Sequence, residues 1–320
     1  METDKKDEIE QLSASASASA SASASLTERM RSATRSVHDK SDRLVNLKLA
    51  LVLTSIRLYG ESIALFAEIY YRLEVILERQ KDHPQLGQFQ ELLPFLQRSE
   101  GFEADVSFYL TPEQLEEMKG VRYRMNTCRK VDSNINTDID GDRKEKVVVN
   151  PPHLMEYLDR LDTLEREDPI RLVAYIYHMY MAIFAGGYII QKLVKKSMRL
   201  QKDSDDGVRA FCMNMNVNVN KTLTSDGNIV PMNGKQIRTE MKRIMNEVIA
   251  PSLNEDEIEG ILDESHHVFR RNNDVVASVK DTAAFTSASD RCRNLVLVPT
   301  AIALVGIFMS VSMSTVFRRT

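Results

Sequence analysis

The chain has 320 residues, of which 43% are hydrophobic and 28% charged, and its formal net charge is -4 with a pI near 6.0. This balance lacks the basic surplus of a nucleic-acid-binding protein, and the length allows one soluble domain of about 250 residues. The cysteines Cys128, Cys212 and Cys292 have no CxxC spacing, which indicates reduced thiols and excludes a disulfide framework.

The first 25 residues join a charged start to an alternating Ser-Ala tract, and we expect this segment to be disordered. It has no hydrophobic region like that of a signal peptide, so the following domain is expected to face the cytosol. A capping box of Ser25 and Glu28 predicts the start of the first helix. The predicted domain covers residues 26–280, with polar insertions at about 128–146 and 202–233.

A single histidine, His38, stands beside the apolar stripe of this first helix. Arg31 and Arg35 precede it by two turns and one turn on the same side. The arrangement suits an axial metal ligand with cations placed for acidic groups, but the residues by themselves favour a partly buried structural histidine. The residues alone leave both interpretations open.

Further helices are predicted wherever apolar residues recur at spacings of three and four, as at 56–79, 84–98 and 151–167. Strand patterns are nearly absent. In the first insertion, Asn136, Asp138 and Asp140 imitate the first half of a calcium loop, but position twelve would be Val147 instead of glutamate. We therefore expect no calcium site there.

A glycine pair, Gly186 and Gly187, interrupts a long apolar helix that we expect to begin with Asp168 as N-cap and Pro169 in its first position. Each glycine inside a helix costs on the order of 1 kcal/mol relative to alanine. Bare backbone would let a broad, flat ligand lie against the helix, while a bend between two helix halves is the alternative. His178, about two turns before the pair, is expected to face elsewhere.

The chain ends with an uncharged stretch, Leu295 to Phe317, that follows a linker at 281–294. A helix of this length spans roughly 34 Å, enough for a bilayer core of about 30 Å. We expect a C-terminal transmembrane helix, inserted after synthesis as a tail anchor. A buried core helix is the alternative.

Three sequence blocks, in this order, resemble the heme oxygenase family: RSATRSVHDKSD, then AYIYHMYMAIFAGGYIIQKL, then QIRTEMKRIMNEVI followed by ESHHVFRRNNDVV. The resemblance runs from about Leu26 to about Asp274, with a gap near 119–150. It implies an all-α fold, a multi-helical heme oxygenase-like bundle that holds heme b between a proximal and a distal helix. The chain looks like an insect-like, tail-anchored member.

By this resemblance, His38 is the axial ligand of the heme iron, and Gly186 and Gly187 lie over the porphyrin in the catalytic site. The residues that it implies bind the heme edge or line the pocket are Arg31, Arg35, Tyr177, Arg238, Lys242, Phe269 and Asn272. The basic members suit propionates, which are carboxylates that need charge-assisted hydrogen bonds. Arg243 is expected to stay on a solvated face.

The resemblance also implies the reaction, which is oxidative cleavage of heme to biliverdin, carbon monoxide and ferrous iron with dioxygen. Electrons would come from NADPH through a partner NADPH-cytochrome reductase, because the chain carries no Rossmann glycine motif or flavin site. Biliverdin reductase would act downstream. The anchor would place the protein at the endoplasmic reticulum membrane, with the outer mitochondrial membrane as the alternative.

One departure from the family pattern bears on turnover. The aspartate that usually precedes the first distal glycine by three residues, where it holds a chain of waters, is replaced by Ile183. Ala185 and Tyr188 replace the usual serine and glutamine beside the pair. Because isoleucine neither donates nor accepts a hydrogen bond, slow turnover and a relaxed choice of rim carbon are expected. A heme-binding sensor or buffer and a tail-anchored helical adaptor stay open as other classes of function.

Overall fold

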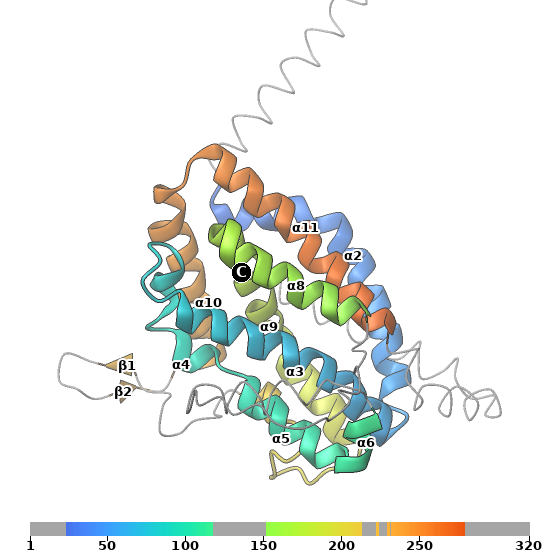
Figure 1. Ribbon diagram of the computed structural model, residues 1–320. Helices are drawn as coiled ribbons and strands as arrows, with labels where there is room; N and C mark the ends of the chain where they lie inside the picture. Colours follow the sequence, from blue (N-terminus) through green and yellow to red (C-terminus); the bar gives the residue numbers. More distant parts are fainter. Residues whose placement is uncertain (1–23, 118–151, 213–221, 224–228, 231, 279–320) are drawn as a thin grey trace, which may run out of the picture.

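The computed structural model describes residues 24–117, 152–212, 222–223, 229–230 and 232–278. This part of the chain is a bundle of helices around one apolar core (Figure 1). The Ser-Ala tract before residue 24, the insertion at 128–146, the linker and the predicted transmembrane helix at 295–317 lie outside the described residues.

The first half of the bundle matches the predicted helices in part. Its elements are α2 (Leu26–Val52), α3 (Ile56–Arg79), the 3-10 helix η1 (Leu86–Phe89), α4 (Leu93–Leu96), α5 (Ser99–Tyr109) and α6 (Pro112–Glu117). The predicted capping box opens α2, where the Glu28 carboxylate accepts the Ser25 N–H at 3.0 Å. The predicted helix at 84–98 is instead two short pieces. The chain here turns so tightly against the end of α3 that a Cβ at Gly87 would clash with the Lys81 carbonyl oxygen.

The second half contains the long apolar helix. Its elements are α8 (Pro152–Glu167), η2 (Pro169–Arg171), α9 (Leu172–Ser197), η3 (Arg209–Phe211), β1 (Thr222–Leu223), β2 (Ile229–Val230), α10 (Gly234–Arg243), the π-helix η4 (Ile244–Ile249), η5 (Ala250–Ser252) and α11 (Glu255–Ser278). Asp168 takes the N-cap position and Pro169 follows it, as predicted, but they open the 3-10 turn η2 that runs directly into α9, and the Asp168 side chain makes no capping hydrogen bond. Its carboxylate pairs with Arg171 at 2.7 Å, because that guanidinium is a charged partner within reach, and a 3-10 turn separates Asp168 from α9.

The described residues are not purely helical. Strands β1 and β2 pair antiparallel, with Thr222 opposite Val230, and form a short hairpin at one side of the bundle (Figure 1). This hairpin falls in the polar segment at 202–233 that was predicted to be a loop insertion. Because each strand has only two residues, the hairpin adds a local feature without changing the all-helical architecture.

Helices α9 and α11 organise the core. Helix α11 packs along α2 and across α9, while α3 packs against α5 (Figure 1). Among the described residues, Pro169–Ser197 is the one helical stretch long and apolar enough to cross a membrane by length and composition, and more than half of its most apolar part is buried inside the fold. This burial is what a core helix of a globular bundle requires.

Buried ionic contacts fix α11 against its neighbours. The Glu264 side chain is fully buried, and its carboxylate accepts hydrogen bonds from Arg160 on α8 and, at 2.7 Å, from the Tyr175 hydroxyl on α9. Burial acts to raise the pKa of Glu264, but these hydrogen bonds bring it below its ordinary value. A buried carboxylate satisfied in this way holds three helices in one arrangement.

Candidate functional site

The predicted proximal histidine lies beside an aromatic wall from α11. His38 on α2 is partly buried, and the centroid of its ring lies 5.3 Å from that of Phe269. Phe269 also contacts the ring of His178 on α9, with 5.0 Å between the centroids. Phe269 therefore connects the helix that carries His38 to the helix that carries the glycine pair.

His178 is part of this cluster, although its distance from the glycines suggested a position elsewhere. His178 is partly buried, and its Nε2 atom is buried without a hydrogen-bond partner in the part of the chain that the structure describes. Burial, with smaller contributions from His38 and His266, lowers the pKa of His178 to about 3, so the ring is neutral at physiological pH. The spacing of residues along α9 could not indicate which face of that helix α11 covers.

The two glycines face different surroundings within the continuous helix α9. A Cβ at Gly186 would meet no atom within 4 Å, whereas one at Gly187 would lie 3.6 Å from both Phe211 and Ile183. Gly186 thus presents bare backbone to open space, and Gly187 packs against η3. Ile183 itself is buried, with 4% of its surface exposed.

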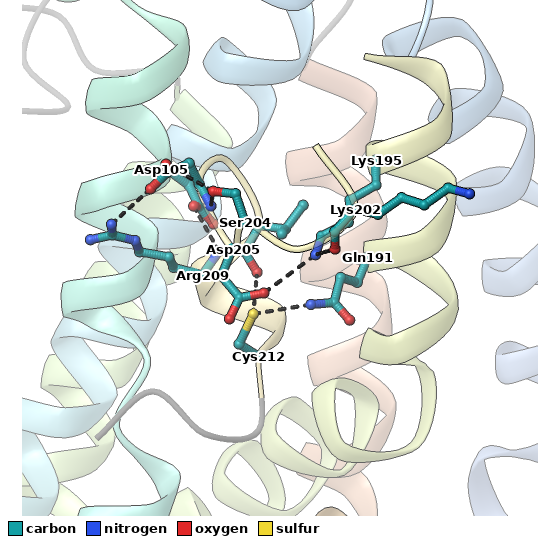
Figure 2. Close-up of polar contacts among 10 residues, drawn as sticks. Asp105, Gln191, Lys195, Lys202, Ser204, Asp205, Arg209 and Cys212 are labelled. Atoms are coloured by element: carbon teal, nitrogen blue, oxygen red, sulfur yellow. Dashed lines mark hydrogen bonds and ion pairs between the residues drawn. The ribbon is translucent and has the colours of Figure 1, made fainter. Parts of the chain in front are cut away.

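The segment after α9 is fastened to the bundle by polar contacts (Figure 2). The Asp105 carboxylate on α5 accepts the N–H groups of Arg209 at 2.8 Å and Ala210 at 2.9 Å. Gln191 on α9 donates to the Cys212 sulfur at 3.0 Å. These bonds flank Phe211, so they hold its ring over Gly187. Burial raises the pKa of Asp105 to about 7, although the two N–H bonds oppose the rise.

Cys212, which Figure 2 also shows, is a structural thiol. It is buried, and its Sγ lies 3.3 Å from the Val208 carbonyl oxygen, to which it donates. Burial raises the pKa of this thiol to about 12, so it stays protonated at physiological pH. In the described part of the chain, the hydrogen bonds of Cys212 serve to anchor η3.

Several of the predicted propionate partners gather at the start of α2. Burial raises the pKa of Tyr177, while a hydrogen bond with Thr27 and the nearby charge of Arg31 oppose the rise. Hydrogen bonds from Ser25 lower the pKa of Glu28, and the charges of Arg31 and Lys242 add to this effect. The charges of Arg31 and Lys242 thus both act on Glu28 in the first turn of α2, and the charge of Arg31 also acts on Tyr177.

The other predicted basic residues lie on the same two helices. Arg35 is exposed one turn beyond Arg31 on α2, and Arg238 is partly exposed one turn before Lys242 on α10. Arg243 pairs with Glu240 at 2.6 Å on the surface, in agreement with the solvated face expected of it. A bond of 3.0 Å from the Thr27 N–H to the Asn246 side chain joins α2 to η4, which follows α10 directly.

The predicted polar residue Asn272 lies against Met179, one turn before Ile183. Its Nδ2 atom donates to the Met179 sulfur at 3.4 Å, and the Tyr157 hydroxyl donates to the same sulfur at 3.5 Å. The Asn272 Oδ1 atom is buried without a hydrogen-bond partner among the described residues. Among the described contacts of Met179, the polar partners are the Asn272 amide and the Tyr157 hydroxyl, and neither is an acid.

These residues fit a heme group. His38 supplies an imidazole for iron, and the absence of a side chain at Gly186 leaves room for a flat ring against the helix. The cations Arg31 and Lys242 and the Tyr177 hydroxyl suit the two propionate carboxylates of a heme group. Phe269 adds an apolar wall beside the imidazole.

Comparison with known proteins decides the family. The family model described as Heme oxygenase matches residues 24–140 and 122–278. The chain belongs to the heme oxygenase family. Among curated heme oxygenases, that of Takifugu rubripes is 25% identical over 178 residues, which cover 55% of this chain and 52% of the relative. Heme oxygenase 2 of Synechocystis is 18% identical over 257 residues, which cover 80% and 83% of the two chains.

Heme oxygenase 1 of Homo sapiens is 24% identical over 192 residues, which cover 58% of this chain and 54% of the relative. The chain thus spans about half the length of the fish and human heme oxygenases that it matches. Among solved structures, heme oxygenase 2 from Chlamydomonas reinhardtii without heme has a TM-score of 0.61, with 22% identity, and the match covers 81% of this chain and all of that one.

Heme oxygenase-1 from Synechocystis, solved in complex with heme, has a TM-score of 0.58 and 18% identity. That match covers 91% of this chain and 100% of the other. These likenesses show that the helical bundle is the heme oxygenase fold.

Proposed function

We propose that this protein is a heme oxygenase, which cleaves heme to biliverdin, carbon monoxide and ferrous iron with dioxygen. The observation that carries the proposal is the pairing of His38 with the open backbone at Gly186, on two helices joined through Phe269. An imidazole and a glycine-lined helix are the two surfaces that a metal-centred flat ring needs. Bound heme would supply both the iron that activates dioxygen and the porphyrin that is cleaved.

Each residue has a defined task in this proposal. The His38 imidazole binds the iron, and Gly186 lets the α9 backbone approach the ring. Arg31, Tyr177 and Lys242 bond the carboxylates, with Arg35 and Arg238 adding positive charge nearby. Phe269 excludes water from the imidazole side.

Ile183 makes the proposed enzyme slow. Its side chain is 4% exposed and has no group that can hold a water molecule by a hydrogen bond. Protons then reach the distal side without a fixed carboxylate to pass them on, which lowers the rate of the proton-coupled steps. The loss of fixed hydrogen bonds also weakens control over which rim carbon is attacked, so we propose more than one biliverdin isomer.

The proposal includes partners and a location. Electrons from NADPH reach the site through an NADPH-cytochrome reductase, since no nucleotide-binding motif is evident in the sequence. The uncharged stretch at 295–317 holds the protein at the endoplasmic reticulum membrane, with the helical domain facing the cytosol. Biliverdin reductase would consume the product.

A paired assay on the full chain in detergent tests the proposal. Hemin is added first, and a Soret band with one heme per chain is expected. His38→Ala should change the ferric spectrum and weaken binding, while the control His153→Ala, at an exposed histidine on α8, should change neither. NADPH and reductase are then added, and slow formation of biliverdin is expected.

The two stages separate the other classes of function. Absence of a Soret band would contradict heme binding and favour the helical adaptor. A normal Soret band with no biliverdin would contradict the enzyme and favour a heme sensor or buffer. An unchanged spectrum in His38→Ala would mean that another residue binds the iron.

A further inference from the structure

We propose that His178 is a positioning residue for the axial ligand, and that it acts through Phe269 to set the orientation of the His38 imidazole. This inference rests on the proposed function, because it takes His38 as the residue that binds heme iron. His178 itself does not touch the iron in this proposal. Its task is to keep the ring that supports His38 in one place.

Four aromatic rings from three helices form a continuous series. Tyr177 and His178, neighbours on α9, have centroids 5.4 Å apart, His178 and Phe269 are 5.0 Å apart, and Phe269 and His38 are 5.3 Å apart. The His178 and Phe269 planes meet at 66°, which is the edge-to-face arrangement that aromatic rings favour. A ring packed against two others cannot turn freely without displacing one of them.

The backbone that carries Phe269 is held independently of this series. Glu264, on the same helix, is anchored by Arg160 and by the Tyr175 hydroxyl, so α11 keeps its place on α8 and α9. The freedom that remains to Phe269 is rotation of its side chain. His178 and His38 both contact the Phe269 ring and therefore restrict that rotation.

The Nε2 atom of His178 is held in the series by packing alone. His178 is partly buried, and Nε2 is buried with no hydrogen-bond partner among the described residues. An unsatisfied buried nitrogen destabilises a fold, so hydrogen bonding through Nε2 is not what favours histidine at this position. The shape of a neutral flat ring is then what the site uses, and a phenyl ring should replace it.

The orientation of the axial imidazole is a property that spectroscopy measures directly. The groups around a ligating histidine fix its ring plane and tune its bond to the metal. Removal of the His178 ring would free Phe269 to rotate, and His38 would then sample more than one orientation. A spread of orientations broadens the iron–histidine stretching band and the range of the ferric resonance positions.

The experiment uses the full chain loaded with hemin. Resonance Raman spectra of the ferrous state and electron paramagnetic resonance of the ferric state are recorded for His178→Ala, His178→Leu and His178→Phe. We expect a shifted, broadened iron–histidine band in the first two and an unchanged band in His178→Phe. His178→Leu retains apolar volume without a flat ring, so it serves if the alanine variant does not fold. His267→Ala, a partly exposed histidine on α11, is the matched control.

The outcomes distinguish this inference from the function on which it rests. An unchanged band in His178→Ala or His178→Leu overturns the positioning role, and so does a His178→Phe band shifted as far as theirs. A rise or no change in the melting temperature of His178→Phe supports packing as the basis, because the unsatisfied nitrogen is gone. Failure of the unmodified chain to bind heme would overturn the proposed function instead.

Discussion

The same substitution, glycine to alanine, should weaken heme binding at one of two neighbouring positions of α9 and leave it unchanged at the other. A methyl group at Gly186 would meet nothing within 4 Å, whereas at Gly187 it would contact Phe211 and Ile183 at 3.6 Å, an ordinary van der Waals distance. Alanine at either position removes the cost of a glycine inside a helix. Each variant should therefore raise the unfolding free energy of the heme-free protein by about 0.5–1 kcal/mol.

Only Gly186→Ala should weaken heme binding. Its methyl group would stand where the flat ring is proposed to lie, and one carbon too many in a filled contact costs about 1–3 kcal/mol. This cost corresponds to a rise in Kd of roughly 5- to 150-fold. The methyl group of Gly187→Ala is directed at η3 instead, so its Kd for heme should stay within about 2-fold of the unmodified value.

Two measurements on each variant decide the matter. Urea unfolding of the heme-free protein gives the stability, and hemin titration followed at the Soret band gives the Kd. Equal weakening of heme binding by both variants would refute the assignment of one open and one packed face. Unchanged binding by Gly186→Ala would show that heme does not lie against this side of α9.

Three further predictions follow from other parts of the fold. Ile183→Asp should speed biliverdin formation if water enters with the acid. The same substitution should lower the unfolding free energy by a few kcal/mol because the position is buried. Equal initial rates for Ile183→Asp and the matched Ile183→Asn would contradict an acid relay. The pKa of Asp105 is about 7 in the folded protein, against a reference value of 3.8. Between pH 3.8 and pH 7 the folded state therefore binds a proton at Asp105 that the unfolded state has released. The unfolding free energy should fall as the pH rises through this range. Asp105→Asn should flatten that dependence in urea unfolding at pH 5 and pH 8, and an unchanged slope would mean that another group causes it. A chain ending near Cys292 should be soluble and still bind heme; loss of folding in place of loss of membrane pelleting would show that the terminal stretch belongs to the core.

Local signals were sufficient for much of the helical framework. The capping box of Ser25 and Glu28 starts α2 as predicted, and apolar spacing located α3 and α8. Such signals act within a few residues of the chain, so they survive folding unchanged. The prediction of one helix failed at 84–98, where the chain turns tightly enough to bring Gly87 against the Lys81 carbonyl oxygen. The start at Asp168 was located correctly, but its side chain pairs with Arg171 instead of making a capping hydrogen bond.

The amino-acid sequence by itself singled out His38, the glycine pair and the basic residues as candidates, and its resemblance to the heme oxygenase family supplied the roles proposed for them. Only the tertiary structure distinguished Gly186 from Gly187, since the difference depends on Phe211 in η3. Only the tertiary structure placed His178 in contact with Phe269, since α11 lies far away along the chain. Helical periodicity determines which residues share a face of a helix, but packing between distant segments determines what that face touches.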